Sequence, residues 1–418
     1  MTPKPPTEQT IGQKLKRHRK AARLTQERLA ERAGGLSVET VRKLEQGVRR
    51  SASLPTLHAL ARALNVPTST LIGDATEAAA RAEPDHRPLS LAAIRRVIAP
   101  VLGLDGAMLN TPAGDPPTLD VLTGRLRTVD RSYQRNDYAA ALAALPPLLA
   151  DVQAAVDVAA DRNQPAAHAL LARTRHLTGN LLIQLRAGDL AQTALAGALD
   201  AARQSGDQVV AATVIQGMCW LLMRQGRLVE AAELATTTAD QIEPKFSRAT
   251  PGQLAAWGWL LVGGAAAYAR DNQPGVAADL VDAAQAAAVR IGERAPEPGH
   301  LMMVGGFDAG RVQMARVENA AVAGDPGRVL DLSRVVPAGP TPVGSSWQRH
   351  RLDVAWAHAQ RRQHHEATEV LVELRHLAPA WLRQQRYARD IVDVIADGRR
   401  RAMTEDLADL AQVVGYVP

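Results

Sequence analysis

The chain contains Leu24-Thr25-Gln26-Glu27-Arg28-Leu29-Ala30, then glycines at Gly34 and Gly35, then Ser37-Val38-Glu39-Thr40-Val41-Arg42-Lys43-Leu44-Glu45-Gln46-Gly47. Each segment predicts a short helix, because the hydroxyl of Thr25 or Ser37 can accept a hydrogen bond from an otherwise unpaired first-turn N–H. Glu27 and Glu39 lie in the first turns, where the helix dipole favours a negative charge. Gly47 suits the C-terminal stop of the second helix. The pattern therefore predicts two helices joined by a tight turn.

The apolar positions predict which faces of these helices are buried. Leu29, Ala30 and Ala33 form one stripe, and Val41 and Leu44 form another. When the two stripes pack together, a short polar and basic face at the start of the second helix points outward, which suits the major groove of DNA. The candidates for contact with base edges are Ser37, Val38, Glu39, Thr40, Arg42 and Lys43.

The stretch from Ile11 to Leu71 resembles the lambda-repressor-like (Xre-type) helix-turn-helix family. The matching residues are Gly12, Leu15, Arg19, Leu24-Thr25-Gln26, Leu29-Ala30, Ala33-Gly34, Ser37, Thr40-Val41, Leu44-Glu45, Gly47, Leu54-Pro55-Thr56-Leu57, Leu60-Ala61 and Ala63-Leu64. The turn from Ala33 to Ser37 is one residue longer than the commonest family pattern. The resemblance implies a five-helix DNA-binding domain in which Arg19 and Glu45 form a structural pair.

Contacts to the DNA backbone are expected beside the base-reading face. Arg49 and Arg50 follow the second helix in a loop from which a long cationic side chain can reach phosphate. Gln26 opens the first helix, whose free amides can also bind phosphate. Residues 1–72 contain 14 Lys and Arg against 5 Asp and Glu, a balance of +9, whereas the remaining chain contains 35 against 38, a balance of −3. Phosphate binding requires such a basic excess, although a solvated basic surface would also produce it.

At 418 residues the chain is long enough for two or more domains. Aromatic residues make up only 3%, so cores must be built from Ala, Leu and Val, which favours helices over sheets. We predict an all-α fold with a five-helix domain at 1–75, a linker with one helix at 76–117, and a helical-repeat region at 118–418. The composition between Thr76 and Pro88 indicates the linker, and the apolar spacing of Leu89–Val101 predicts its helix.

A pattern recurs from Thr118 onward: an apolar helix, a small polar turn, and a second helix that opens on alanine. The turns are Arg135-Asn136-Asp137, Ala187-Gly188-Asp189, Gln225-Gly226-Arg227, Asp271-Asn272-Gln273, Ala323-Gly324-Asp325 and Arg362-Gln363-His364. The alanines are Ala139, Ala191, Ala231, Ala277 and Ala367, and none follows Gly324-Asp325. Successive turns from Gly188 onward are roughly 38 to 52 residues apart, near the period of helical-pair repeats. The region resembles a degenerate tetratricopeptide-like α-solenoid, in which each pair stacks on its neighbours.

The order of the two regions is similar to that of bacterial regulators common in high-GC actinobacteria. The segments Leu374–Trp381 and Tyr387–Asp390 extend this resemblance to the C-terminal part. In some members such helical regions sense a peptide or a small molecule. The candidates to line an effector groove are Trp257, Trp259, Trp347, Trp356 and Trp381, with Arg311 or Asn319 as polar anchors. The alternative is that the tryptophans fill gaps in an alanine-rich core.

The sequence contains no catalytic constellation, and we predict that the protein is not an enzyme and binds no cofactor or metal. Neither a Gly-x-Ser-x-Gly motif nor a phosphate-binding loop is present. His364-His365-Glu366 is the most metal-like cluster, but adjacent helical residues point about 100° apart, so its two histidines cannot easily share an ion. Cys219 is the single cysteine, which excludes an internal disulfide and fits a buried thiol.

The remaining features predict a cytoplasmic protein. Met1–Thr10 lacks the apolar region of a signal peptide. Leu254–Ala269 is the most apolar stretch, yet its length of about 16 residues is short of the roughly 20 needed to span a bilayer. We expect a buried helix there.

Together these features predict a sequence-specific, DNA-binding transcriptional regulator. Its helical-repeat region is expected to form a homodimer and to bind a peptide or small-molecule effector. A dimer would bind double-stranded DNA at an inverted-repeat operator. The alternative is a helical-repeat scaffold whose N-terminal domain binds protein rather than DNA.

Overall fold

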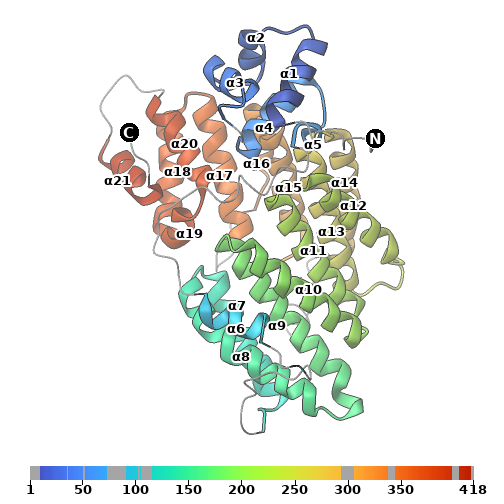
Figure 1. Cartoon of the computed structure of the whole chain (residues 1–418). Helices are drawn as coiled ribbons and strands as arrows, with labels where there is room; N and C mark the ends of the chain where they lie inside the picture. Colours follow the sequence, from blue (N-terminus) through green and yellow to red (C-terminus); the bar gives the residue numbers. More distant parts are fainter. Residues whose placement is uncertain are drawn as a thin grey trace, which may run out of the picture.

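The computed structural model describes residues 10–34, 36–49, 52–72, 91–101, 104, 115–292, 306–337, 344–397 and 404–415. Within these ranges the chain forms α-helices and one short 3-10 helix at Asp161–Asn163, and no strand (Figure 1). The predicted all-α fold is therefore confirmed. Arg50 and the linker segment between Thr76 and Pro88 lie outside the described residues.

The N-terminal domain consists of five helices, as predicted. They are α1 (Ile11–Ala21), α2 (Gln26–Arg32), α3 (Val38–Glu45), α4 (Leu54–Leu64) and α5 (Thr68–Ile72). The first four begin after a side chain that accepts a first-turn backbone N–H, and these capping residues are Thr10, Thr25, Ser37 and Ser53. Gly47 follows α3 with a φ of 72°, so it provides the predicted stop.

The apolar stripes of α2 and α3 meet in the core of this domain. Leu15, Leu29, Val41 and Leu44 have no exposed surface. Gly12 allows α1 to approach the end of α3, because a Cβ at this position would lie 2.0 Å from the Leu44 carbonyl oxygen. The position of α3 therefore depends on a residue without a side chain.

The rest of the described chain forms a helical array built from helix pairs. The pairs are α7 (Leu119–Gln134) with α8 (Tyr138–Val158), α9 (Gln164–Gln184) with α10 (Gly188–Ser205), α11 (Gln208–Arg224) with α12 (Leu228–Gln241), α13 (Pro251–Arg270) with α14 (Pro274–Ile291), α15 (Ala309–Val322) with α16 (Pro326–Ser333), and α17 (Ser345–Gln360) with α18 (His364–Leu377). The remaining helices are α6 (Ala92–Ile98), α19 (Pro379–Arg383), α20 (Arg386–Asp397) and α21 (Glu405–Val414). The predicted linker helix, α6, packs against α8 and α10.

A tight turn joins the helices of each of these pairs, and it contains one residue in the left-handed conformation. These residues are Asn136, Arg186, Gly226, Asn272, Gly324 and Arg362, with φ between 57° and 77°. Five of the predicted turns include this residue. The turn predicted at Ala187-Gly188-Asp189 is wrong by a residue or two, because Gly188 already begins α10.

A small buried side chain lies five positions after each left-handed residue. These side chains are Ala141, Ala191, Ala231, Ala277, Val329 and Ala367, and none is more than 1% exposed. The prediction for Ala139 is wrong, because Ala139 is exposed and Ala141 occupies the buried position. Val329 takes the place where the sequence lacks an alanine. Small residues here let the two helices of a pair approach closely.

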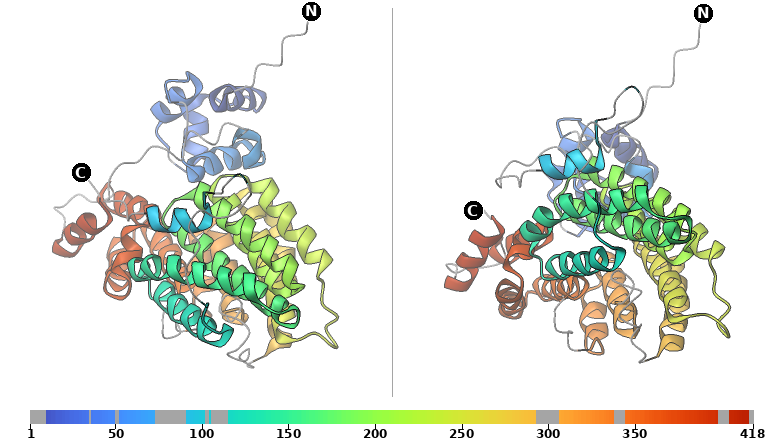
Figure 2. Two further views of the ribbon diagram at one scale, coloured as in Figure 1. Left: turned by 60° about the horizontal axis from the view of Figure 1, so that its bottom comes forward. Right: turned by 90° about the horizontal axis from the view of Figure 1, so that it is seen from below.

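The first helices of successive pairs pack against one another from α7 through α9, α11, α13 and α15 to α17. We call the face that they line the inner face. One apolar core contains residues from α6 to α11 and from α17 to α21, so the C-terminal helices return to the first pairs (Figures 1 and 2). The Arg186 guanidinium also donates to the Gln384 carbonyl oxygen at 3.4 Å.

The apolar helices of the array form its cores. Leu254–Ala269 belongs to α13 and is almost wholly buried, as predicted, and Cys219 is 1% exposed. Among the described helices, α8 is long and apolar enough to cross a membrane by length and composition, a test that core helices of soluble proteins also pass. It packs against α7, α9 and α6.

The N-terminal domain packs on the array through α4 and α5. The last carbonyl groups of a helix have no partner within it, and here side chains of the N-terminal domain supply one. His58 Nδ1 lies 2.7 Å from the Arg270 carbonyl oxygen at the end of α13, and Nε2 lies 2.9 Å from the Val322 carbonyl oxygen at the end of α15. The Thr68 hydroxyl also donates to the Arg270 carbonyl, at 2.6 Å, and Arg62 donates to that of Ala323.

The turn after α13 makes the reciprocal contacts. The Asp271 carboxylate accepts the Ser69 backbone N–H at 2.8 Å, in the first turn of α5. The Asn272 amide donates to the Val66 carbonyl oxygen at 3.3 Å. Leu228, which opens α12, is buried in the apolar core of the N-terminal domain. These polar and apolar contacts together fix how the domain lies on the array.

We expect this packing to weaken as the pH falls. Burial lowers the pKa of His58 below its usual 6.5; with the charges of Arg62 and Arg270 it outweighs the Arg270 and Val322 carbonyl oxygens, which raise the pKa by accepting from the ring. The stability contributed by neutral His58 is therefore present above pH 6.5 and is lost as the pH falls below that value. Between about pH 7.5 and 5.5, amide hydrogen exchange corrected for intrinsic rates should show severalfold lower protection in α4 and α5.

The control for this experiment is the His58→Gln variant, whose side chain does not titrate in this range. Its protection in α4 and α5 should be lower than that of the unmodified protein at pH 7.5 and should not change with pH. An equal pH response in both proteins would assign the effect to another group.

Candidate nucleic-acid interface

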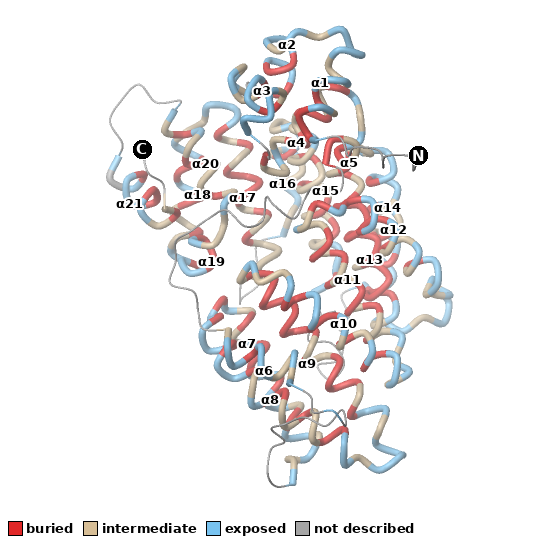
Figure 3. Tube along the Cα trace, in the orientation of Figure 1, coloured by how far each residue is buried: buried red, intermediate tan, exposed pale blue. Residues whose placement is uncertain are grey.

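The part of the N-terminal domain that carries α2 and α3 points away from the helical array (Figure 1). α4 and α5 face the array, and many exposed positions lie on α2 and α3 (Figure 3). Ser37, Glu39, Arg42 and Lys43 are exposed, and Thr40 is half-buried. Most of the residues predicted to contact bases therefore lie on a surface that the array leaves open.

Two residues at the start of α3 have structural roles. The Ser37 hydroxyl accepts the Thr40 backbone N–H at 3.2 Å and lies 2.8 Å from the Thr40 hydroxyl, so it caps the helix. Val38 is half-buried and packs against the core of the domain. The prediction that Val38 faces outward is correct only in part, because its apolar side chain lies at the edge of the core.

Glu39 pairs with both basic side chains of α3. Its carboxylate lies 3.0 Å from Arg42 Nη1 and 3.6 Å from Lys43 Nζ. All three side chains are about half exposed, so each pair contributes only about 0.5 kcal/mol. Arg42 and Lys43 can therefore exchange Glu39 for a DNA acceptor at little cost.

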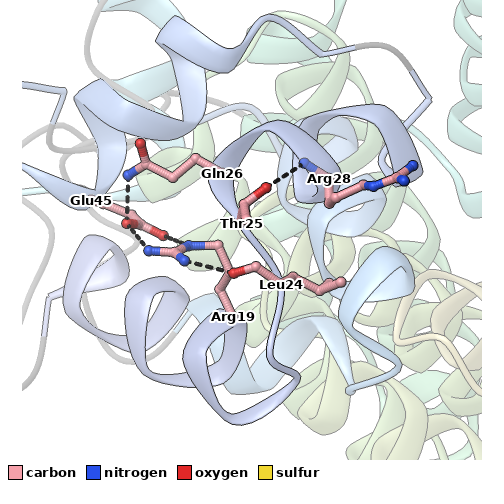
Figure 4. Close-up of polar contacts among 6 residues, drawn as sticks. All are labelled: Arg19, Leu24, Thr25, Gln26, Arg28 and Glu45. Atoms are coloured by element: carbon pink, nitrogen blue, oxygen red, sulfur yellow. Dashed lines mark hydrogen bonds and ion pairs between the residues drawn. The ribbon is translucent and has the colours of Figure 1, made fainter.

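A polar network fixes α3 against α1 and α2 (Figure 4). Arg19 donates to both carboxylate oxygens of Glu45, at 2.6 and 2.8 Å, and to the Leu24 carbonyl oxygen at 2.7 Å. The Gln26 amide donates to Glu45 at 2.8 Å. Burial alone would raise the pKa of Glu45, but hydrogen bonds from Arg19 and Gln26 outweigh it and lower the pKa. The predicted Arg19–Glu45 pair is confirmed, and Gln26 is held by Glu45 in the free protein.

Arg49 lies in the exposed loop that follows α3. Its backbone N–H donates to the Lys43 carbonyl oxygen at 3.0 Å, which keeps the loop close to the end of the helix. The side chain therefore starts from the same exposed surface as Arg42 and Lys43.

Comparison with known families matches the N-terminal part of the chain. Residues 15–71 match the family model described as Helix-turn-helix, which extends from within α1 to within α5. The N-terminal domain is therefore a helix-turn-helix domain, a class whose second helix commonly enters the major groove of DNA. No curated protein and no solved structure matches the chain.

The residues predicted to line an effector groove separate into different environments. Arg311 lies over the ring of Trp259, with 5.0 Å between the guanidinium carbon and the ring centroid, so the structure brings these two together. Trp257 is 8% exposed and packs edge-on against Phe246 in the core. Trp259 also packs against Phe307, with 6.1 Å between the ring centroids, so both tryptophans border the apolar core.

The other predicted groove residues lie further along the array. Trp347 contacts Arg351, with 5.6 Å between the ring centroid and the guanidinium carbon. Trp356 is half-buried against two apolar clusters, and Trp381 is 2% exposed. Asn319 is half-buried on α15. The structure shows Trp356 and Trp381 as gap-filling residues, which is the alternative noted from the sequence.

Sequence reasoning missed a network of charged residues on the inner face. Arg270 of α13 lies 2.6 Å from Glu318 of α15, and Arg349 lies 3.5 Å from Asp353, both on α17. The Tyr387 ring of α20 lies 4.5 Å from the Arg349 guanidinium carbon. Burial raises the pKa of Asp353, whereas the neighbouring arginines outweigh burial at Glu318 and lower its pKa. Arg311 and Arg349 lie at the same distance before their turns, which is a signal that the sequence offers for part of this region.

We expect Gly12→Ala to disturb the position of α3. The added Cβ would contact the backbone of Leu44, so α1 and α3 must move apart, at a cost of about 1–3 kcal/mol. Hydrogen exchange should show lost protection in α1 and α3, and DNA affinity should fall. Gly124→Ala in α7 is the matched control, because a Cβ there meets nothing within 4 Å. Equal behaviour of the two variants would contradict the close approach.

Proposed function

We propose that this protein is a sequence-specific, DNA-binding transcriptional regulator. The observation that carries the proposal is a helix-turn-helix domain whose α3 is exposed and basic while α4 and α5 contact the array. The balance of +9 in residues 1–72 supports it. The proposed base contacts are Ser37, Val38, Glu39, Thr40, Arg42 and Lys43, and the proposed backbone contacts are Gln26, Arg49 and Arg50.

We propose further that the array is a tetratricopeptide-like solenoid that dimerises and senses an effector, and that it has no catalytic role. Paired helices, left-handed turns and a small buried residue at a fixed place in each pair support this assignment. The same order of regions is found in the actinobacterial regulators that the chain resembles. Such a regulator would act in the cytoplasm, where it can reach DNA.

The DNA-binding proposal can be tested with two single substitutions on the same surface. Arg42→Ala should relax preference at one or two base positions, because an arginine bidentate to guanine contributes roughly 1–3 kcal/mol of discrimination. Arg49→Ala should weaken binding to all sequences about equally and reduce the salt slope by about one. Selection from a randomised library and mobility shifts at several salt concentrations would measure both effects.

Each variant is the control for the other, since both remove one positive charge. A motif unchanged in Arg42→Ala would contradict the base-reading role of α3. An absence of salt-sensitive binding by the unmodified protein would favour the protein-binding scaffold instead.

We expect the full-length protein to be a homodimer held mainly by the array. A single DNA-binding domain buries only about 600–1,000 Å² of protein surface on DNA and seldom gives full sequence specificity alone. Two copies should protect half-sites about 10 base pairs apart, or a multiple of that, in a footprinting experiment. Light scattering should give twice the mass of the chain. A protein that is monomeric both free and on DNA would disprove this architecture.

A further inference from the structure

Four arginines from four helices gather on one part of the inner face. They are Arg224 of α11, Arg270 of α13, Arg311 of α15 and Arg349 of α17. The charges of Arg349, Arg186 and Arg270 act on Arg224, and those of Arg270, Arg349 and Arg311 act together on Glu318. The four guanidinium groups therefore belong to one electrostatic neighbourhood.

The repeat geometry places these side chains in two rows. Trp259, Arg311 and Arg349 each lie thirteen positions before the left-handed residue of their own turn. Arg224 and Arg270 each lie two positions before theirs. Residues at the same place in stacked pairs form rows along the shared face, so Arg311 and Arg349 belong to one row and Arg224 and Arg270 to another.

Carboxylates do not balance this charge. Glu318 pairs with Arg270 and Asp353 with Arg349, so two of the four arginines have an acidic partner. Arg311 contacts the Trp259 ring, and its buried Nε has no hydrogen-bond partner. Within the described part of the chain, the Arg224 side chain makes no hydrogen bond or ion pair. With Arg186, which acts on Arg224, and Asp308, which acts on Arg311, five positive charges face three negative ones, and this excess favours a bound anion.

The unpaired charge is accessible from solvent. Arg224 is exposed, yet desolvation by the surrounding helices lowers its pKa to about 10, so it remains charged at neutral pH. Tyr133 of α7 also acts on Arg224, so helices from distant parts of the chain enclose it.

We propose that this part of the inner face binds a compact anion carrying carboxylate or phosphate groups, held by Arg224, Arg270 and Arg311. Guanidinium groups match both kinds of oxyanion through paired N–H donors. The site rests on the proposed sensing role of the array and gives its effector a chemical class. Trp259 supports Arg311 from below, and Glu318 occupies Arg270 when the anion is absent.

Arg270 connects this site to the N-terminal domain. Its guanidinium faces the inner face, while its carbonyl oxygen accepts hydrogen bonds from His58 and Thr68. An anion that draws Arg270 away from Glu318 shifts the end of α13, and the contacts that hold α4 and α5 change with it. The anion-bound and anion-free proteins then differ in the contacts that hold α4 and α5, and so in the orientation of α3 toward DNA.

The test is isothermal titration of the full-length protein with citrate and with pyrophosphate, at constant ionic strength and without DNA. Saturable binding of one anion per chain is expected for at least one of them, and the preferred one distinguishes carboxylate from phosphate. Binding of neither would overturn the proposal. Because no DNA is present, that result would leave the mobility-shift test of the regulator unaffected.

Three variants locate the site. Arg224→Gln should weaken binding at least tenfold, whereas Arg203→Gln, on the exposed surface of α10, should not change it. Glu318→Gln should strengthen binding severalfold, because it removes the carboxylate that competes for Arg270, and such a gain cannot arise from misfolding. Equal affinity in Arg224→Gln and Arg203→Gln, or a loss in Glu318→Gln, would overturn the assignment.

The connection to the N-terminal domain needs a separate measurement. At saturating anion, hydrogen exchange should change in α5 and in the turn Asp271-Asn272-Gln273. The same anion should leave these segments unchanged in Arg224→Gln. Binding without any change in exchange there would retain the site and overturn its coupling to α3.

Discussion

A single left-handed residue in each helix-pair turn is the constraint on which the array depends. For Arg186 and Arg362, which carry side chains, this conformation costs about 1–2 kcal/mol compared with a right-handed one. The turn fixes where the second helix starts, so the residue five positions later always faces the first helix. A chain with 3% aromatic residues buries little surface at each contact. It therefore relies on many close approaches, and these require a small side chain at that position.

The N-terminal domain could be predicted closely because its signals are local. The hydroxyls of Thr25 and Ser37 and the conformation of Gly47 act within a few residues of where they stand. In the array, the helix pairs were predictable, but the position of the small buried residue within each pair was not. Alanine is common throughout the chain, so an alanine near a turn did not distinguish Ala139 from Ala141. Only the backbone conformation of the turn makes that distinction.

Prediction of the inner face was limited because its residues come together only when the helix pairs pack. Trp257 and Trp259 are two positions apart and so point about 200° apart on a helix, one into the core and one onto the inner face. The arginines of the cluster come from different pairs and meet only when the pairs stack. The contacts of His58 span more than 200 residues, and their partners are backbone carbonyls, which have no signature in a sequence.

The packing of the N-terminal domain on the array limits how modular this protein is. Helix ends of α13 and α15 receive hydrogen bonds from His58, Thr68 and Arg62, and Gly324 leaves the space that Arg62 occupies. A chimera carrying a foreign helix-turn-helix domain would leave those carbonyl groups without partners. Grafting only the outward residues of α3 would retarget the protein while keeping its domain contacts intact. Exchanging residues within α3 therefore disturbs the fold less than exchanging the whole N-terminal domain.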